Sequence, residues 1–236
     1  LRMGSSYLNE QHTPQRLSLS SPYNYKDQTK VIIIQDINKN DGDAVSTAFR
    51  ELFLAANGGG LGVFTSIQRL KYVQDKILAP LTDAHLALYS QHVDDMDIGT
   101  LIDMFREDQH SCLLGTDAVR DGVDVPGDAL RLLIFDRVPW PRPSVLHRQR
   151  KSAFGQIMGS PRQFDEALTR LKLKQAYGRL IRSQSDKGVF VMLDSALPSR
   201  LHDAFPPDVV IQKLSLSDSC HTIRHFLQDL KDANVA

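Results

Sequence analysis

Short apolar runs alternate along the chain with longer segments in which apolar residues recur at helical spacing. The apolar runs predict buried strands at residues 31–34, 61–65, 84–89, 111–115, 130–135 and 188–193. The longer segments predict helices at residues 43–57, 66–79 and 97–108, over most of 143–183 with a break around 155–161, and at 220–233. Strands that alternate with helices at this spacing predict a mainly parallel sheet with helices on both faces.

Individual residues set the predicted ends of these helices. Asp43 is expected to cap the first helix, and the glycines at 58–60 are expected to stop it near Asn57. Pro80 is expected to end the second helix. Because parallel sheets of this kind bind ligands beyond the carboxyl ends of their strands, we expect the functional residues just after the strands.

The composition is typical of a folded domain that needs no cross-links. Of the 236 residues 42% are apolar, and the only cysteines, Cys112 and Cys220, exclude a disulfide framework, a four-thiolate iron–sulfur site and a cysteine-rich zinc site within this chain. No apolar run reaches the roughly 18 residues of a membrane span, so we expect no membrane partner. The chain begins with Leu1 and shows no leader, from which we expect a cytoplasmic piece of a longer protein.

Charge is balanced over the chain, with 28 basic and 28 acidic residues, but it is separated along the sequence. From Lys26 to Asp128 there are 9 Lys or Arg against 17 Asp or Glu, and from Arg142 to Lys187 there are 11 against 3. The second stretch is a candidate surface for nucleotide phosphates or a nucleic-acid backbone. A solvated helix face is the alternative.

The strongest local signal lies at residues 175–182. Gln175, Arg179 and Arg182 have the spacing of one helix face. Two guanidinium groups beside an amide can hold the oxygens of a phosphoryl group in transfer. The alternative is an ordinary basic helix that contains Gly178, although an interior glycine costs a helix about 1 kcal/mol.

A second signal follows the predicted strand at 111–115. Thr116 and several small residues suit a loop that approaches a phosphate closely. In the same loop, Asp124 follows Gly122 by two residues and is a candidate acceptor for a ribose hydroxyl. A turn that uses Asp and Gly for conformational reasons is the alternative.

The glycine-rich stretch at 58–62 does not match the dinucleotide-binding fingerprint, because its glycines precede the strand. Thr65 and Ser66 instead stand at a strand end and a helix start, where backbone N–H groups favour a phosphate. The sequence contains no Gly-x-x-x-x-Gly-Lys-Ser/Thr motif, so this chain has no phosphate-cradling Walker loop of its own.

Two further features are weaker. Cys220, His221 and His225 have the spacing of a metal-binding pair without a partner pair, so no metal site is predicted. Trp140, between two prolines, is either a stacking platform or a packing residue, and packing is the commoner role.

Taken in order, these stretches resemble the second RecA-like domain of superfamily 2 helicases, in the XPD/DinG-like branch. Residues 60–66 resemble motif IV, 115–127 resemble motif V with its Gly-x-Asp-x-x-Gly core, and 175–182 resemble motif VI. Shorter matches, which extend the resemblance over nearly the whole chain, lie at 21–25, 137–140, 186–188 and 193–194.

The resemblance implies a RecA-like α/β domain at residues 31–236 with helical additions around 143–183, entered from the interdomain junction through an irregular segment at 1–30. It implies the C-terminal motor domain of a DNA-stimulated, ATP-dependent DNA helicase that moves 5′→3′. ATP with Mg would be bound mainly by a first RecA-like domain of the same polypeptide. An iron–sulfur cluster would also lie there, outside this chain, and the chain alone is expected not to hydrolyse ATP.

The resemblance also implies roles for the residues near the nucleotide. Gln175, Arg179 and Arg182 would face ATP, with Arg182 as the arginine finger and Arg179 as a second phosphate contact. Gly122 and Asp124 would lie at the nucleotide and couple it to the DNA track.

For DNA, the resemblance implies that Thr65, Ser66 and Thr116 contact the phosphates of a single strand. The main alternative function is a nucleic-acid-binding module without ATPase activity, although such a module would not need the one-faced set at 175–182. A dinucleotide-binding enzyme is disfavoured by the position of the glycines.

Overall fold

A sheet of seven parallel strands forms the centre of the structure, a computed structural model that describes residues 21–117, 119, 125, 127–157 and 160–233. In chain order the strands are β1 Thr29–Ile34, β2 Gly60–Val63, β3 Ala87–Ser90, β4 Ser111–Gly115, β5 Leu132–Phe135, β6 Gly188–Met192 and β7 Ile211–Leu214. Their order across the sheet is β3-β4-β2-β5-β6-β1-β7, and each pair is parallel. This confirms the predicted α/β fold class.

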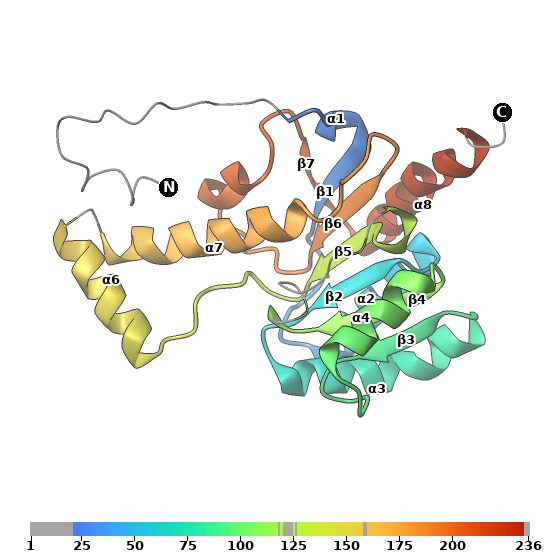
Figure 1. Cartoon of the computed structure of the whole chain (residues 1–236), viewed down its shortest axis with the longest axis horizontal. Coiled ribbons are helices and arrows are strands. Elements are labelled where there is room, and N and C mark those ends of the chain that lie inside the picture. The colour runs from blue at the N-terminus through green and yellow to red at the C-terminus, as the bar shows by residue number, and fades with distance from the viewer. Residues whose placement is uncertain (1–20, 118, 120–124, 126, 158–159, 234–236) are drawn as a thin grey trace.

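Helices cover both faces of the sheet (Figure 1). Within the described residues the helices are α1 Tyr25–Gln28, α2 Gly42–Ala56, α3 Ile67–Asp83, α4 Ile98–Glu107, α6 Val145–Ile157, α7 Pro161–Tyr177 and α8 Leu216–Ala233, with short 3-10 helices η1 Gly127–Ala129 and η2 Ser199–Ala204. One apolar cluster packs α4, α7 and η2 against one face, and a second packs α2, α3 and α8 against the other. The run in β1 is therefore continuously apolar: Val31 and Ile33 join the first cluster, and Ile32 and Ile34 the second.

The start of α2 differs from the prediction, whereas its end agrees. Asp41, and not Asp43, caps the helix, because its Oδ1 accepts the N–H groups of Asp43 at 3.0 Å and Ala44 at 3.1 Å. At the other end, Asn57 takes a left-handed conformation with φ of 55° and closes the helix where the glycine run begins.

The second predicted helix does not stop at Pro80. Helix α3 continues through this proline to Asp83, and Leu81, which is fully buried, packs its last turn into the core. That burial outweighs the missing backbone hydrogen bond. The longer helix also displaces the next strand: His85 makes a turn with φ of 58°, and β3 begins at Ala87.

The sequence prediction did not include helix α1 or strand β7. The first 30 residues are not irregular throughout, because α1 lies there and β1 already begins at Thr29. Strand β7 lies at one edge of the sheet, hydrogen-bonded to β1, and includes the polar residues Gln212 and Lys213. An edge strand of this kind has no continuous apolar run for the sequence to reveal.

The predicted break within residues 143–183 is confirmed between α6 and α7. Ser160 and Gln163 form a capping box at the start of α7. Figure 1 shows α6 and the start of α7 projecting beyond the sheet. His147 and Lys151 on α6 both contact the carboxylate of Asp165 on α7, with 2.9 Å between His147 Nε2 and Asp165 Oδ1, and so tie the two helices together.

A close contact between β6 and the turn before it predicts a specific loss of stability. A Cβ at Gly188 would lie 2.8 Å from Leu180 Cβ, so Gly188→Ala should lower the free energy of unfolding by about 1–3 kcal/mol. Gly178→Ala is the matched control, because Gly178 is right-handed and its nearest obstacle, Lys174 O, is 3.3 Å away. Urea unfolding that finds the two variants equally stable would contradict this packing.

Candidate functional site

The segment with the strongest sequence signal is not one helix face. Helix α7 ends at Tyr177 with Gly178 as its cap, so Gln175 lies in the last helical turn while Arg179 and Arg182 follow the helix. The N–H of Arg179 donates to Ala176 O at 3.2 Å, which marks a tighter turn than a helix. The predicted common helix face is therefore wrong.

Burial explains why the helix stops. Leu180 and Ile181, between the two arginines, are 2% and 3% exposed and join the core cluster under α7. In a continued helix, Leu180 and Ile181 would point in different directions around the helix axis. The turn instead lets both side chains pack into the core. Arg179 and Arg182 thus lie on either side of two buried apolar residues, Leu180 and Ile181.

A buried carboxylate fixes the turn at Arg182. Asp186 is 7% exposed, and its Oδ2 accepts the N–H groups of Arg182 at 2.8 Å and Ser183 at 2.9 Å. Its Oδ1 accepts the Ser183 hydroxyl at 2.5 Å. Hydrogen bonds to a carboxylate are among the stronger ones in proteins, so this turn is held firmly.

The segment before β1 holds the same turn from the other side. The hydroxyl of Tyr23 donates to Arg182 O at 2.6 Å. The side-chain amide of Gln28 donates to three carbonyl oxygens within residues 183–186, at 2.9, 3.1 and 3.0 Å. The backbone of Arg182 is therefore bonded at both its N–H and its C=O.

This turn precedes β6 and so lies at the amino ends of the strands. Gln175, Arg179 and Arg182 therefore do not follow a strand, whereas Thr65, Ser66 and Thr116 lie just after β2 and β4, where functional residues are expected. Gly122 and Asp124 lie outside the described residues. In the chain they come between the carboxyl end of β4, at Gly115, and the amino end of β5, at Leu132.

The residues predicted to contact DNA are brought together at the carboxyl edge. Strands β2 and β4 are neighbours, and the N–H of Phe64 donates to Gly115 O at 2.8 Å, so Thr65 and Thr116 leave adjacent strand ends. Ser66 is the N-cap residue of α3, yet its side chain makes no capping hydrogen bond among the described residues.

Thr116 is held by the side chain of Gln91, which directly follows the neighbouring strand β3. Its N–H and its hydroxyl both donate to Gln91 Oε1, each at 2.9 Å, so the hydroxyl oxygen keeps its lone pairs for another donor. The following residue, Asp117, binds Lys172 on α7 at 2.9 Å. The start of the β4–β5 segment is therefore tied to α7.

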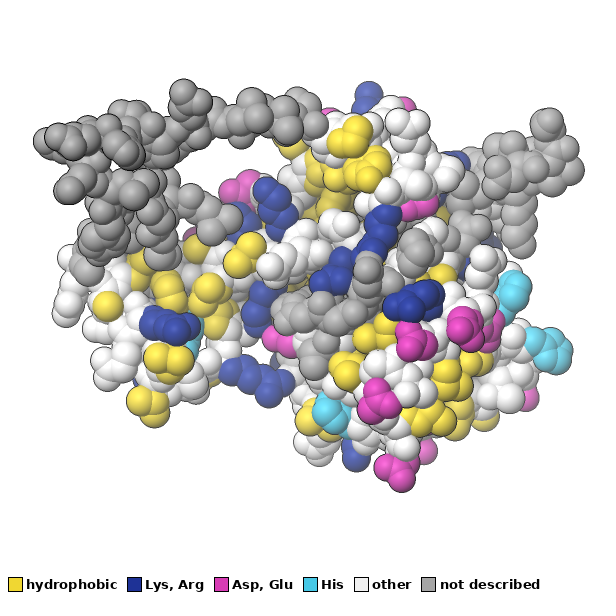
Figure 2. Space-filling model, in the orientation of Figure 1, with side chains coloured by type: hydrophobic (Ala, Val, Ile, Leu, Met, Phe, Trp, Pro, Cys, Tyr) yellow, Lys and Arg dark blue, Asp and Glu magenta, His cyan; other side chains and the backbone are white. Residues whose placement is uncertain are grey.

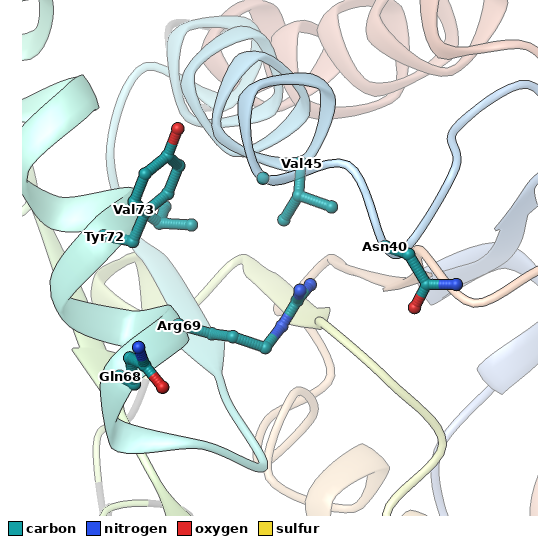
Figure 3. A pocket seen from close by; sticks show the side chains of 7 residues that line it. Asn40, Val45, Gln68, Arg69, Tyr72 and Val73 are labelled. Atoms are coloured by element: carbon teal, nitrogen blue, oxygen red, sulfur yellow. The ribbon is translucent and has the colours of Figure 1, made fainter.

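A pocket of about 280 Å³ lies between the first turns of α2 and α3, just after Ser66 in the chain (Figure 3). Its lining residues are Asn40, Gly42, Val45, Gln68, Arg69, Tyr72 and Val73. The guanidinium of Arg69 points into it and binds Asp136, with Nε to Oδ2 at 2.9 Å and Nη2 to Oδ1 at 2.5 Å. Asp136 is fully buried, so Arg69 balances its charge, and the hydrogen bond to Asp136 raises the pKa of Arg69.

One further ion pair and two hydrogen bonds join the loops around this pocket. Lys39, after β1, binds both carboxylate oxygens of Asp194, after β6, at 2.8 and 2.9 Å. Arg137, after β5, donates to Asn40 Oδ1 at 2.9 Å and to Lys39 O at 3.2 Å. Sequence reasoning did not assign these pairs, although Asp136 and Asp194 are the kind of residue that follows a strand at a ligand-binding edge.

Charge is separated in space as well as in sequence. Figure 2 shows Lys and Arg side chains across the middle and left of one face, and most of that face's acidic side chains at its lower right. Within the described ranges, no group of three or more His, Cys, Asp or Glu side chains is placed to hold a metal ion. Burial raises the pKa of the Cys112 thiol to about 12 and that of Cys220 to about 11.

Comparison with known proteins places this arrangement in a family. A family model described as the helicase C-terminal domain matches residues 49–208, which is more than half of the chain. The chain belongs to this helicase family. Across the described part of the chain, no helix has the length and apolar character of a bilayer span.

Curated relatives confirm the predicted branch. The ATP-dependent helicase DinG of Mycobacterium tuberculosis is 30% identical over 161 residues, which cover 67% of this chain and 24% of DinG. The ATP-dependent DNA helicase YoaA of Escherichia coli is 30% identical over 196 residues, covering 80% of this chain and 30% of YoaA. The chain thus spans less than a third of either relative.

Solved structures agree in fold. Xpd4 of S. tokodaii superposes with a TM-score of 0.59 and 13% identity, over 84% of this chain and 42% of Xpd4. Dbp5 of S. cerevisiae, bound to RNA and ADP BeF3, gives a TM-score of 0.56 and 17% identity, over 85% of this chain and 46% of Dbp5. Together with the family match, these likenesses confirm the RecA-like helicase domain.

The buried pair at the pocket predicts a large stability difference between two arginines. Arg69→Met leaves Asp136 charged and buried without its partner, so the free energy of unfolding should fall by about 3–5 kcal/mol. Arg50→Met is the matched control, because both partners in its pair with Glu51 keep 36% of their side-chain surface exposed, so the pair should contribute less than about 1 kcal/mol. If both variants lose the same free energy of unfolding in urea at pH 7, Arg69 does not stabilise the buried charge of Asp136.

Proposed function

We propose that this chain is the C-terminal motor domain of an ATP-dependent DNA helicase that moves 5′→3′ along single-stranded DNA. ATP with Mg²⁺ is bound mainly by a first RecA-like domain of the same polypeptide. The relatives' printed names include ATP-dependent DNA helicase, and this chain covers 30% or less of the two relatives described, which leaves room for such a domain. An iron–sulfur cluster, where one exists, belongs to that first domain.

The observation that carries the proposal is the fixed turn with Arg179 and Arg182. When ATP is hydrolysed, charge spreads over the equatorial oxygens of the transferred phosphoryl group. A guanidinium stabilises that charge most when its donors need not reorganise during the reaction. The backbone of Arg182 is bonded on both sides by Asp186 and Tyr23, so it is in place before the nucleotide arrives.

The roles proposed within this site come from the resemblance of residues 175–182 to motif VI. Arg182 is the arginine finger, Arg179 contacts a second phosphate oxygen, and Gln175, exposed in the last turn of α7, completes the set. Gly122 and Asp124 are proposed to contact the nucleotide. In this proposal, the connection between β4 and β5 that contains them couples the nucleotide to the DNA track.

The carboxyl edge supplies one side of that track. Thr65, Ser66 and Thr116 bind DNA phosphates there, helped by the N–H groups in the first turn of α3. The Ser66 hydroxyl is not used to cap its own helix among the described residues, and so it is available as a donor to phosphate oxygen.

The arginine finger predicts a loss of turnover without a loss of DNA binding. In a protein that carries both RecA-like domains, Arg182→Lys should lower DNA-stimulated ATPase turnover by roughly 10³-fold, because a flexible ammonium cannot reproduce the planar guanidinium. Affinity for single-stranded DNA without ATP should stay within about twofold by fluorescence anisotropy.

Lys174→Ala is the control for this experiment, because Lys174 is exposed on α7. Lys172 does not serve, since it binds Asp117. Near-normal turnover in Arg182→Lys would reject the finger. A turnover loss that matches a loss of DNA affinity would instead favour a nucleic-acid-binding module without its own part in ATP hydrolysis.

The proposed DNA track predicts binding through phosphates. The chain should bind single-stranded oligonucleotides of different sequence with similar affinity, and the affinity should fall steeply with salt as counterions are released. Thr65→Val with Ser66→Ala should weaken binding by about tenfold, because hydrogen bonds to a charged group are lost. Thr47→Val, on an exposed position of α2, should leave it unchanged. Strong base preference or salt-independent binding would contradict the assignment.

A further inference from the structure

The chain has one tryptophan, and the structure leaves it partly uncovered. Trp140 lies in the loop after β5 and is 39% exposed, although Val138, two residues earlier, is only 4% exposed. The backbone N–H of Trp140 donates to Val138 O at 2.8 Å, and prolines on both sides restrict the backbone. The indole is therefore held at the surface by a stiff loop and is not wholly a packing residue.

This loop is anchored at both ends to the carboxyl edge of the sheet. Before Trp140, Arg137 donates to Asn40 Oδ1 and Lys39 O in the loop after β1. After it, the guanidinium of Arg142 donates to the carbonyl oxygen of Thr65. Trp140 therefore stands two residues from a direct contact with the proposed DNA track.

The chain beyond Trp140 has the charge of a surface that binds a polyanion. Residues 142–151 hold four Lys or Arg and no Asp or Glu. Of these, Arg148 and Arg150 are exposed on α6, and the apolar side chains of Val145 and Leu146 are 68% and 58% exposed beside them. Cations next to exposed apolar surface suit a ligand that joins charged phosphates to flat apolar rings.

We propose that Trp140 is a base-stacking site for the single strand that this domain binds. A nucleobase lies on the exposed face of the indole while the phosphates on either side lie near Thr65, Arg142 and the start of α6. This inference rests on the proposed function, because it names what the bases do when the phosphates are held at the carboxyl edge. Stacking on an aromatic side chain tolerates every base, which suits a helicase that must move along any sequence.

The single tryptophan makes the test direct, since emission excited at a wavelength that the six tyrosines do not absorb reports Trp140 alone. The chain is titrated with an oligothymidylate and, separately, with an abasic oligonucleotide of equal length. Binding of both is followed by competition against a labelled strand in an anisotropy assay. The bases should quench the tryptophan emission in proportion to occupancy, whereas the abasic strand should bind more weakly and leave the emission nearly unchanged.

Variants give an independent measure. Trp140→Ala should weaken oligothymidylate binding by about 5- to 100-fold, whereas Trp140→Phe, which keeps an aromatic face, should stay within about threefold of the unmodified chain. Val210→Ala, at an exposed position just before β7, is the control for loss of surface apolar area and should change nothing. Circular dichroism checks that each variant is folded.

The outcomes separate the inference from the function on which it rests. Oligothymidylate binding without a change in emission, equal quenching by the abasic strand, or unchanged affinity of a folded Trp140→Ala would overturn base stacking and leave DNA binding intact. If no oligonucleotide binds in the anisotropy assay, the proposed DNA track itself is wrong.

Discussion

Asp186 lies beneath the turn that carries Arg182, and its carboxylate replaces hydrogen bonds that neither a helix nor the sheet provides there. The turn leaves α7 at Gly178 and reaches β6 at Gly188, where the backbone approaches Leu180 too closely for a side chain. An unpaired N–H beneath such a turn would cost about 1–3 kcal/mol, so Asp186 and the burial of Leu180 define one position for this backbone. The direction in which Arg182 can reach a nucleotide depends on that position.

The two candidate surfaces lie at opposite ends of the same sheet. The arginine turn lies at the amino ends of the strands, and Thr65, Ser66 and Thr116 lie at the carboxyl ends. A rigid sheet with buried cores on both faces keeps the distance between these ends constant. In the proposed helicase, a change at the nucleotide therefore moves the DNA side as one body, and the β4–β5 segment adds a covalent route between the two.

The sequence was a good guide to the fold because each buried strand needs apolar residues on both faces. It was a poor guide where burial decides an end: Leu81 carries α3 past Pro80, and Leu180 and Ile181 end the helix that the arginine spacing predicted. The resemblance assigned Thr65, Ser66 and Thr116 to one DNA strand, and the pairing of β2 with β4 places them at adjacent strand ends. The resemblance missed the Arg69–Asp136 pair, because no local pattern distinguishes a buried carboxylate from an exposed one.

The central claim is that Arg182 acts on charge that develops only in the transition state. The most direct test compares the affinity of a protein with both RecA-like domains for ADP and for ADP with aluminium fluoride, in the presence of Mg²⁺ and single-stranded DNA. Arg182→Lys should lower affinity for the fluoride complex by about 100-fold or more, because transition-state analogues depend on such contacts, and should leave ADP affinity within about threefold. Equal changes in both affinities, or none in either, would contradict the account.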